Sequence, residues 1–315
     1  MTNINELGEF GLLDRLTGDI KPGPGVVKGI GDDCAVLERD ERTYSLVTTD
    51  MLVSGDHFSC DWHTPFQIGW KSMIVNVSDI ASMGGVPDYA LVSMALTDDI
   101  QVEFMDGVFQ GMKEACSRYG ISLIGGDTTH GETFVINVAM IGHVEKDRLC
   151  MRSHAQVGDL ICLTGDLGKS WAGLESLMAG KEGYTEFHLS PQCRYETARE
   201  LAPYVNAMID VSDGLASEVN HICRQSRVGA EIILEDIPIS HRTRETGELL
   251  GKDPMIWALS GGEDFELLYT ISEDNIRHIE KTNPIIVGRI TEEGIYLMDH
   301  GERIPLKGGY DHFKR

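Results

Sequence analysis

The sequence predicts a two-domain α/β protein. With 315 residues, the chain exceeds the usual size of a single hydrophobic core, so two domains of roughly 150 residues each are expected. Its content of 42% hydrophobic and 24% charged residues is typical of a globular chain that can form a substantial core. Along both halves, apolar runs with strand character alternate with helical patterns, which favours an α/β architecture.

The first half contains clear helix and strand signals. Acidic residues inside the apolar pattern of residues 1–16 indicate an amphipathic helix rather than a signal peptide. Thr64-Pro65 supplies an N-cap and first-turn pair for a second helix, which Gly84-Gly85 ends. Gly120 ends a third helix in the same way. The elements expected here are helices 1–16, 65–83 and 102–119 and strands 44–48, 90–96, 121–124 and 133–144.

A charged segment, residues 145–148, separates the two halves. It predicts an N-terminal domain of residues 1–147 and a C-terminal domain of residues 148–315. Strand-like and helical patterns continue beyond this boundary, so the second domain is expected to be α/β or α+β. The elements expected there are helices 170–179 and 215–226 and strands 160–164, 230–234, 265–270, 285–289 and 295–298.

The net charge of −23, from 27 basic and 50 acidic residues, restricts the partners of the protein. It argues against non-specific binding of nucleic acid and against attraction to anionic membranes. Since no run approaches the ~20 apolar residues of a membrane span, we expect a cytoplasmic protein. Seven cysteines without a Cys-x-x-Cys pair indicate neither a disulfide framework nor a zinc site.

Six short segments combine glycine, serine or threonine with acidic residues, and we expect them at chain turns. Any one of them is explained by the turn preference of Gly and Asp. Six together exceed what that preference explains, and Asp79 lies in a predicted helix, where the turn argument does not apply. The joint pattern therefore indicates a functional site. The segments are Gly29-Ile30-Gly31-Asp32-Asp33, Thr48-Thr49-Asp50, Asn76-Val77-Ser78-Asp79, Gly125-Gly126-Asp127-Thr128, Asp210-Val211-Ser212-Asp213-Gly214 and Ser260-Gly261-Gly262-Glu263-Asp264.

The chemistry of these segments favours magnesium. Carboxylates gathered in one site raise one another's pKa unless a multivalent cation lies between them. Hard oxygen ligands select Mg²⁺ or Ca²⁺, and Mg²⁺ takes substrate phosphates as further ligands. Asn76 and Asp79 share one face of an otherwise apolar helix, and no neighbouring residue is an obvious partner for the buried Asp. The sequence thus predicts a magnesium site that holds nucleotide phosphates.

Three basic or ionisable residues are further candidates. Residues 163–170 follow a strand and end in Gly-Lys-Ser like a P-loop, but Leu163 stands where that motif requires glycine. We interpret the segment as a strand-to-helix turn, and a contact of Lys169 with phosphate stays open. Arg152 is the best-placed cation for a nucleotide phosphate, the alternative being an ordinary surface arginine. His57 can face a bound anion, although a lone histidine is more often structural.

Taken in order, the six segments resemble the thiamine-monophosphate kinase family. The resemblance spans nearly the whole chain and includes Gly-Tyr-Asp-His-Phe at 309–313. It implies the two-domain fold of the aminoimidazole ribonucleotide synthetase-like group, with a mixed N-terminal sheet that pairs in a homodimer and an α/β C-terminal domain that closes the site. It also implies ATP-dependent phosphorylation of thiamine monophosphate to thiamine diphosphate with several Mg²⁺ ions. Whether K⁺ takes part stays open.

The same resemblance assigns roles to residues of this sequence. Metal ligands would be Asp33, Thr48, Thr49, Asp50, Asp79, Asp127, Asp210 and Asp213, with Asp32 assisting. Nucleotide contacts would involve Gly126, Asp127, Arg152 and Ser212. Thiamine monophosphate would meet His57, Glu263 and Tyr310. The residues expected to be essential for catalysis are Asp50, Asp79, Asp127 and Asp210.

The sequence also bears on alternative functions, both within this group of enzymes and outside it. No cysteine precedes Asp33, which weakens a selenophosphate synthetase-like assignment, and the chain ends in Phe-Lys-Arg rather than in the cysteine of the hydrogenase maturation relative. An aminoimidazole ribonucleotide synthetase-like cyclase remains the alternative enzyme. A non-catalytic nucleotide- or Mg²⁺-binding protein remains the alternative of another class. For the kinase we expect direct in-line transfer without a general base, because a phosphate monoester with a second pKa near ~6 is largely ionised at neutral pH.

Overall fold

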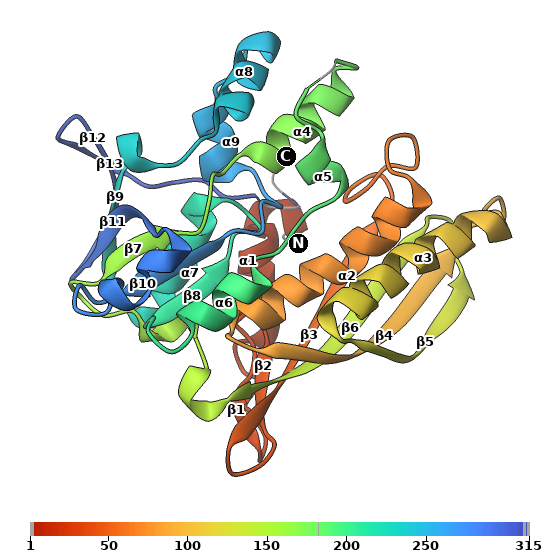
Figure 1. The fold of residues 1–315 in the computed structure, drawn as a ribbon, viewed down its shortest axis with the longest axis horizontal. Coiled ribbons are helices and arrows are strands. Elements are labelled where there is room, and N and C mark those ends of the chain that lie inside the picture. Colours follow the sequence, from red (N-terminus) through yellow and green to blue (C-terminus); the bar gives the residue numbers. More distant parts are fainter. Residues whose placement is uncertain (1–2, 182, 311–312, 314–315) are drawn as a thin grey trace.

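Two β-sheets with helices packed against them make up the protein (Figure 1). The computed structural model describes residues 3–181, 183–310 and 313. One sheet has six strands and comes from the first half of the chain, and the other has seven strands and comes from the second half. The predicted α/β fold is therefore confirmed. None of the helices within the described ranges has the length and apolar character needed to cross a lipid bilayer.

The first sheet positions most of the predicted acidic residues. Its strands are β1 (Val26–Lys28), β2 (Ala35–Glu38), β3 (Thr43–Val53), β4 (Val86–Leu96), β5 (Ser122–His130) and β6 (Val135–Glu145). They lie in the order β1-β2-β3-β6-β4-β5, with β4 and β5 parallel and the other neighbours antiparallel. Val138 and Met140 of β6 are fully buried beneath helices, whereas alternate residues such as Ala139 and Ile141 are half-buried on the opposite face.

Helices α2 (Pro65–Ser82) and α3 (Val102–Tyr119) pack against each other over this sheet. Thr64 caps α2 by accepting a hydrogen bond from the Gln67 backbone N–H, as the sequence predicts. The two helix backbones approach closely because the contact positions are glycines. A Cβ added at Gly69 would lie 1.8 Å from the Val108 carbonyl oxygen, and one at Gly111 would lie 2.0 Å from that of Phe66.

The second sheet belongs to the C-terminal half. Its strands lie in the order β13-β12-β9-β11-β7-β10-β8. Their bounds are β7 (Leu160–Leu163), β8 (Ala207–Asp210), β9 (Gly229–Ile233), β10 (Leu267–Ile271), β11 (Ile285–Thr291), β12 (Ile295–Asp299) and β13 (Glu302–Pro305). The associated helices are α4 (Lys169–Met178), α5 (Glu186–Leu189), α6 (Tyr195–Leu201), α7 (Leu215–Ser226), α8 (His241–Leu250) and α9 (Pro254–Ser260).

The remaining elements are short or terminal. Helix α1 (Ile4–Thr17) confirms the predicted N-terminal helix, but its regular geometry breaks at Gly8, whose φ is 71°. The 3₁₀ turns are η1 (Lys146–Arg148), η2 (Arg152–His154), η3 (Leu234–Asp236), η4 (Ile276–His278) and η5 (Glu280–Thr282).

Helix α2 lies at the junction of the two halves (Figure 1). The indole N–H of Trp70 donates a 2.8 Å hydrogen bond to the Pro191 carbonyl of the second half. On another element of this junction, Arg199 of α6 forms a bidentate pair with Glu145, with bonds of 2.8 and 2.9 Å. Ala81, in the C-terminal part of α2, is fully buried in an apolar cluster that the second half forms. These contacts fix α2 against both halves.

The sequence predicts the first three helices and most strands, including the four-residue β7, but it underestimates the length of β3 and β5 and misses several other elements. Helix α3 is confirmed with its predicted bounds, and α2 ends one residue before the expected position. Strands β1, β2, β8 and β13 and helices α5, α6, α8 and α9 were not expected. The expectation that all six acidic segments lie at turns is wrong for three of them, since Asp50 lies inside β3, Asp127 lies inside β5, and Asp79 lies inside α2, where a helix was also predicted. Glycine and threonine segments can pair as strands when neighbouring strands supply the hydrogen bonds.

Candidate functional site

Helix α2 directs a row of polar side chains at acidic residues from other elements. The hydroxyl of Ser78 donates to Asp210 at the end of β8 (2.6 Å), and the hydroxyl of Ser82 donates to Asp33 (2.6 Å). On the same helix, the carboxylate of Asp79 accepts a 2.5 Å bond from the Thr48 hydroxyl of β3. Residues separated by 162 positions or more in the sequence, such as Thr48 and Asp210, are thereby joined through one helix.

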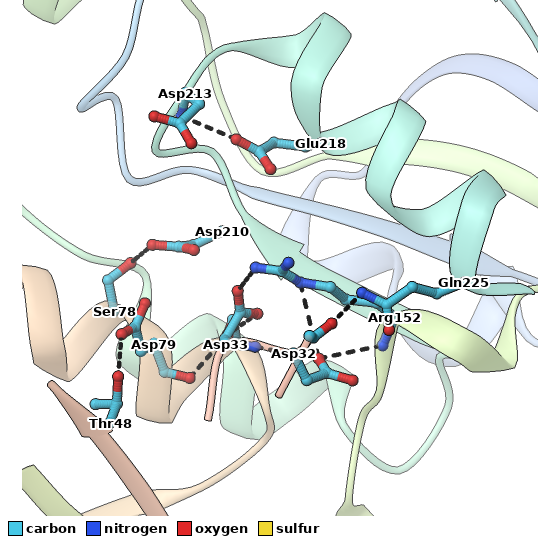
Figure 2. A network of polar contacts seen from close by, with 12 residues as sticks. Asp32, Asp33, Thr48, Ser78, Asp79, Arg152, Asp210, Asp213, Glu218 and Gln225 are labelled. Carbon is cyan, nitrogen blue, oxygen red and sulfur yellow. Dashed lines mark hydrogen bonds and ion pairs between the residues drawn. The ribbon is translucent and has the colours of Figure 1, made fainter. Parts of the chain in front are cut away.

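Four carboxylates form what we call the acidic basin: Asp33, Asp50, Asp79 and Asp210. Carboxylate oxygens of Asp33, Asp79 and Asp210 lie within 4.8 Å of one another. Figure 2 shows these three side chains pointing toward a common space from the loop before β2, from α2 and from β8. Asp50 of β3 is the nearest further carboxylate, since its charge raises the pKa of Asp79. The gathering predicted from the sequence is therefore present for these four residues.

The acidic basin is electrostatically unfavourable without a cation. Burial raises the pKa of Asp50 to about 6, and burial together with Asp33 raises the pKa of Asp210 to about 8. Burial and the neighbouring charges of Asp50, Asp210 and Asp33 hold the pKa of Asp79 well above its ordinary value. Hard oxygen donors this close together match the ligand preference of Mg²⁺ or Ca²⁺. The residues present thus fit a divalent cation.

Arg152 closes one side of the acidic basin. Its guanidinium forms an ion pair with Asp33, its Nε lies 3.8 Å from Asp32, and its backbone N–H donates to Asp32. Figure 2 shows the side chain reaching over both aspartates. Burial opposes the charge of Arg152, but Asp33, Glu218 and Asp32 raise its pKa. The cation that the sequence singles out therefore neutralises part of the basin in this structure.

Asp213 and Glu218 form a second acidic pair next to Arg152 (Figure 2). The backbone N–H of Asp213 donates a 2.8 Å bond to the Glu218 carboxylate. Glu218 is buried on α7, and burial together with the charge of Asp213 holds its pKa well above the ordinary value. Sequence reasoning missed Glu218, which lies five residues after Asp213 and resembles an ordinary acidic residue in the first turn of a helix.

A cavity of about 290 Å³ opens beside the acidic basin. It is lined by Asp50 of the basin and by residues of both halves. Among them are Ser212 and Asp213, predicted for nucleotide and metal, and all three residues predicted for the organic substrate: His57, Glu263 and Tyr310. The structure thus brings these predicted residues together around one space.

Local backbone geometry explains why Glu263 faces this cavity. The Gly261-Gly262-Glu263 turn packs against Ser212, whose carbonyl accepts a 2.8 Å bond from the Glu263 N–H. A Cβ at Gly262 would lie 2.2 Å from the Ser212 carbonyl oxygen, so only glycine allows this approach. Glu263 itself has a φ of 65°, a conformation that a non-glycine residue adopts rarely. The turn is therefore built to present the Glu263 side chain.

Two buried groups flank the Glu263 carboxylate. The ammonium of Lys71 on α2 lies 2.7 Å from it, and His188 of α5 lies 3.4 Å from it. Burial alone would raise the pKa of Glu263, but Lys71 and His188 lower it well below its ordinary range. Sequence reasoning missed Lys71 and His188. The signal for Lys71 was available, because it is a charged residue in an otherwise apolar helix.

Aromatic residues also line the cavity. The rings of Trp171 and Tyr310 meet edge to face, with centroids 6.0 Å apart. Phe265 contributes a further surface, while Trp257 is buried and does not line the cavity. Sequence reasoning missed Trp171. Of the terminal motif 309–313, the positions 311 and 312 lie outside the described residues.

Three predicted residues are not brought into the acidic basin. Thr49 points to the opposite face of the sheet from Thr48, and its hydroxyl contacts Asn137. Gly126 and Asp127 lie on the edge strand β5, where Gly126 is in register with Val92 of β4 and lies three strands from Asp50. At ~4.8 Å per strand, this separation is roughly 14 Å. The packing of β5 against β4 explains why glycine occupies position 126, since a Cβ there would lie 1.7 Å from the Val92 carbonyl oxygen.

The segment that resembles a P-loop is a structural turn. Lys169 is buried and forms an ion pair with Glu266 of the adjacent strand end, which Arg194 also contacts at 2.6 Å. The N–H groups of Gly168 and Ser170 at the start of α4 donate to Asp264 rather than standing open. The interpretation of residues 163–170 as a strand-to-helix turn is therefore confirmed.

Comparison with known proteins covers the whole chain. Residues 31–144 match the family model of the AIR synthase related protein N-terminal domain, and residues 156–298 match that of its C-terminal domain. A thiamine-monophosphate kinase of Aquifex aeolicus (strain VF5) is 37% identical over 98% of this chain and 99% of its own length. A thiamine-monophosphate kinase of Bacillus subtilis (strain 168) is 33% identical over 98% of this chain and 100% of its own length. A solved structure of AaThiL complexed with AMPPCP and TMP is 35% identical, covers 99% of both chains and superposes with a TM-score of 0.90.

Acid is expected to destabilise the protein through His63, a buried neighbour of His188. Burial and the nearby Lys71 lower the pKa of His63 from 6.5 to about 4. Between these values the unfolded chain binds a proton that the folded chain does not, so stability falls as the pH decreases from 6.5 to 4. The loss approaches ~3 kcal/mol, at ~1.4 kcal/mol per pH unit. In His63→Phe, the free energy of unfolding from urea denaturation should change less steeply with pH across this range. The difference in slope should correspond to nearly one proton. An unchanged slope would contradict the burial argument.

Proposed function

The chain belongs to the thiamine-monophosphate kinase family, and on this premise we propose that it transfers the γ-phosphoryl group of ATP to thiamine monophosphate, yielding thiamine diphosphate and ADP. The observation that carries this proposal is the acidic basin beside a cavity lined by His57, Glu263 and Tyr310. AMPPCP is a non-hydrolysable triphosphate analogue of ATP, and its presence with TMP in the solved relative supports the same pair of substrates here.

We propose that the acidic basin holds Mg²⁺. Asp33, Asp79 and Asp210 would be the central ligands, with Asp50 and the Thr48 hydroxyl beside them. When bound, Mg²⁺ neutralises the phosphate oxygens and orients them for in-line transfer. The carboxylates of this chain supply the negative charge that makes divalent cations preferable to monovalent ones at this position.

The remaining roles follow from position around the cavity. Ser212 and Asp213 line the cavity where the triphosphate would extend away from the acidic basin, and Arg152 would exchange its contact with Asp33 for a phosphate contact. The organic part of thiamine monophosphate would occupy the space between His57, Glu263 and Tyr310. These assignments place the two phosphate groups that react near Asp50, where the two sets of residues meet.

Direct transfer fits the groups that line the cavity. A phosphate monoester has a second pKa near ~6, so its attacking oxygen is already ionised at neutral pH and needs no general base. The chain therefore has two tasks, which are to bring two polyanions together and to hold them in line. No covalent phosphoenzyme is required by this scheme.

We further propose that the chain works as a homodimer formed through its first sheet. Strand β5 forms one of the two open edges of that sheet among the described strands, and its Leu123 and Ile124 are 40% and 54% exposed. The sheet face opposite α2 and α3 is only half-buried. Because Asp127 lies too far from the basin of its own chain, its predicted role as a metal or nucleotide ligand would be exerted across this interface.

The proposed activity is tested directly with the purified protein. Incubation with ATP, Mg²⁺ and thiamine monophosphate should yield thiamine diphosphate and ADP in equal amounts, measured by chromatography. Turnover of formylglycinamidine ribonucleotide instead would identify a cyclase. Nucleotide binding without either product would identify a non-catalytic sensor.

Asp79→Asn should separate metal binding from folding. The amide has the shape of the carboxylate but no charge, so turnover at saturating Mg²⁺ should fall by about 10²-fold or more. Removing one of several buried like charges should leave the melting temperature without metal unchanged or higher. The increase in melting temperature that Mg²⁺ and nucleotide cause in the unmodified protein should be reduced in the variant. Unmodified rates in this variant would refute the assignment.

Ile124→Asp should disrupt the proposed homodimer. A carboxylate buried in an apolar interface lacks a partner, so sedimentation velocity should report a monomer where the unmodified chain is a dimer. If Asp127 acts across the interface, the monomer should also lose most of its turnover. Val102→Asp, at another exposed apolar residue at the start of α3, is the matched control and should remain dimeric. A monomeric unmodified protein would overturn the proposal.

A further inference from the structure

Lys71 is a fully buried lysine at the junction of the two halves. Its side chain is 0% exposed, although it belongs to α2, whose buried face is otherwise apolar or weakly polar at this level. The ammonium donates a 2.6 Å bond to the His57 carbonyl and a 2.8 Å bond to Glu263, whose other carboxylate oxygen lies 2.7 Å away. Its described partners are thus one residue from each half, and both line the cavity.

Glu263 is held between Lys71 and the cavity. Its side chain is 27% exposed, so part of the carboxylate remains accessible while the ammonium covers another part. Lys71 itself does not line the cavity, whereas Val75, one helical turn further along α2, does. Lys71 therefore lies behind Glu263, and its effect on a ligand would be exerted through that residue.

Other contacts also restrict the position of the Glu263 carboxylate. Its backbone N–H is bonded to Ser212, its φ of 65° fixes the direction of the side chain, and His188 approaches the carboxylate at 3.4 Å. A carboxylate confined in this way acts as a fixed acceptor and a fixed negative charge. It suits a ligand portion that is cationic or rich in N–H donors.

We propose that Lys71 is a positioning residue for the organic substrate, which fixes the Glu263 carboxylate and the His57 backbone so that they receive the cationic, amine-bearing ring portion of that substrate. The proposal rests on the proposed function, because thiamine monophosphate combines a positively charged thiazolium with an aminopyrimidine. It assigns Lys71 to recognition of that portion and not to the nucleotide or the metal, which meet the acidic basin.

The chain contains a matched control for this proposal. Lys169 is another almost fully buried lysine, and it also pairs with a glutamate, Glu266. Glu266 keeps a second cationic partner in Arg194, and neither Lys169 nor Glu266 lines the cavity. Lys169→Met therefore removes a comparable buried ion pair without touching the residues that face the substrate.

Steady-state kinetics with full-length protein tests the proposal. In Lys71→Met, the KM for thiamine monophosphate should rise at least tenfold, while the KM for ATP and kcat should stay within about threefold of the unmodified values. In Lys169→Met, the KM for thiamine monophosphate should not change. An unchanged KM in Lys71→Met would overturn the proposal, and so would equal increases for both substrates or an equal increase in the Lys169 control.

A double variant covers the case in which Lys71→Met does not fold. Lys71→Met removes the ammonium from the partly exposed Glu263 carboxylate and leaves only His188 beside it, whereas Lys71→Met with Glu263→Gln removes both charges and should fold. If Lys71 acts through Glu263, the double variant should show the same raised KM as Glu263→Gln alone, with no further increase. A double variant with an unmodified KM, or with increases that add, would overturn the proposal.

Calorimetric binding of thiamine monophosphate separates this proposal from the proposed function. An unmodified protein that binds thiamine monophosphate but forms no thiamine diphosphate would refute only the kinase activity. The Lys71 comparison would then be made on Kd, with the same tenfold loss expected in Lys71→Met. An unmodified protein that does not bind thiamine monophosphate at all would overturn both.

Discussion

Mutual repulsion among buried carboxylates is the constraint on which the site depends. Asp33, Asp79 and Asp210 bring their oxygens within 4.8 Å, and because Asp210 is buried and the other two are half-buried, little water screens them. Within the described chain, hydroxyl groups of Ser78, Ser82 and Thr48 and the single guanidinium of Arg152 offset only part of this charge. A fold that keeps such a cluster together therefore maintains a site whose most favourable state contains divalent cations.

Helix α2 is the element that makes this cluster compatible with a stable fold. Its apolar side packs on β3, β6 and α3, where Ile74, Val77 and Ile80 are fully buried. Its other side carries the polar residues that meet both halves of the chain, from Lys71 at one end to Ser82 at the other. Because the apolar side fixes the helix, the polar side cannot withdraw from the acidic basin to relieve the repulsion.

Sequence patterns predict the long elements and the members of the acidic basin, but not how the members meet. Asp79 stood out because a helix interior gives no turn-forming reason for an aspartate, and the structure places it in contact with Thr48 and close to Asp33 and Asp210. Short helices such as α5 and short strands such as β8 carry too few residues for a periodic pattern, so they were missed. Asp127 shows the other limit, since strand register places it on the edge strand β5, three strands from Asp50, and no local sequence pattern predicts that register.

The carboxylates of the acidic basin and the carboxylate of Glu263 lie in opposite electrostatic surroundings. This difference distinguishes the ligands that the two places can hold. In the acidic basin, carboxylates outnumber the cations beside them, so their pKa values are raised and an external cation is needed. At Glu263, Lys71 and His188 accompany a single carboxylate, its pKa is lowered, and the charge is stable without an ion. A site that holds metal and triphosphate beside an organic cation requires both arrangements, because a metal at Glu263 would repel the organic cation that we propose for this carboxylate.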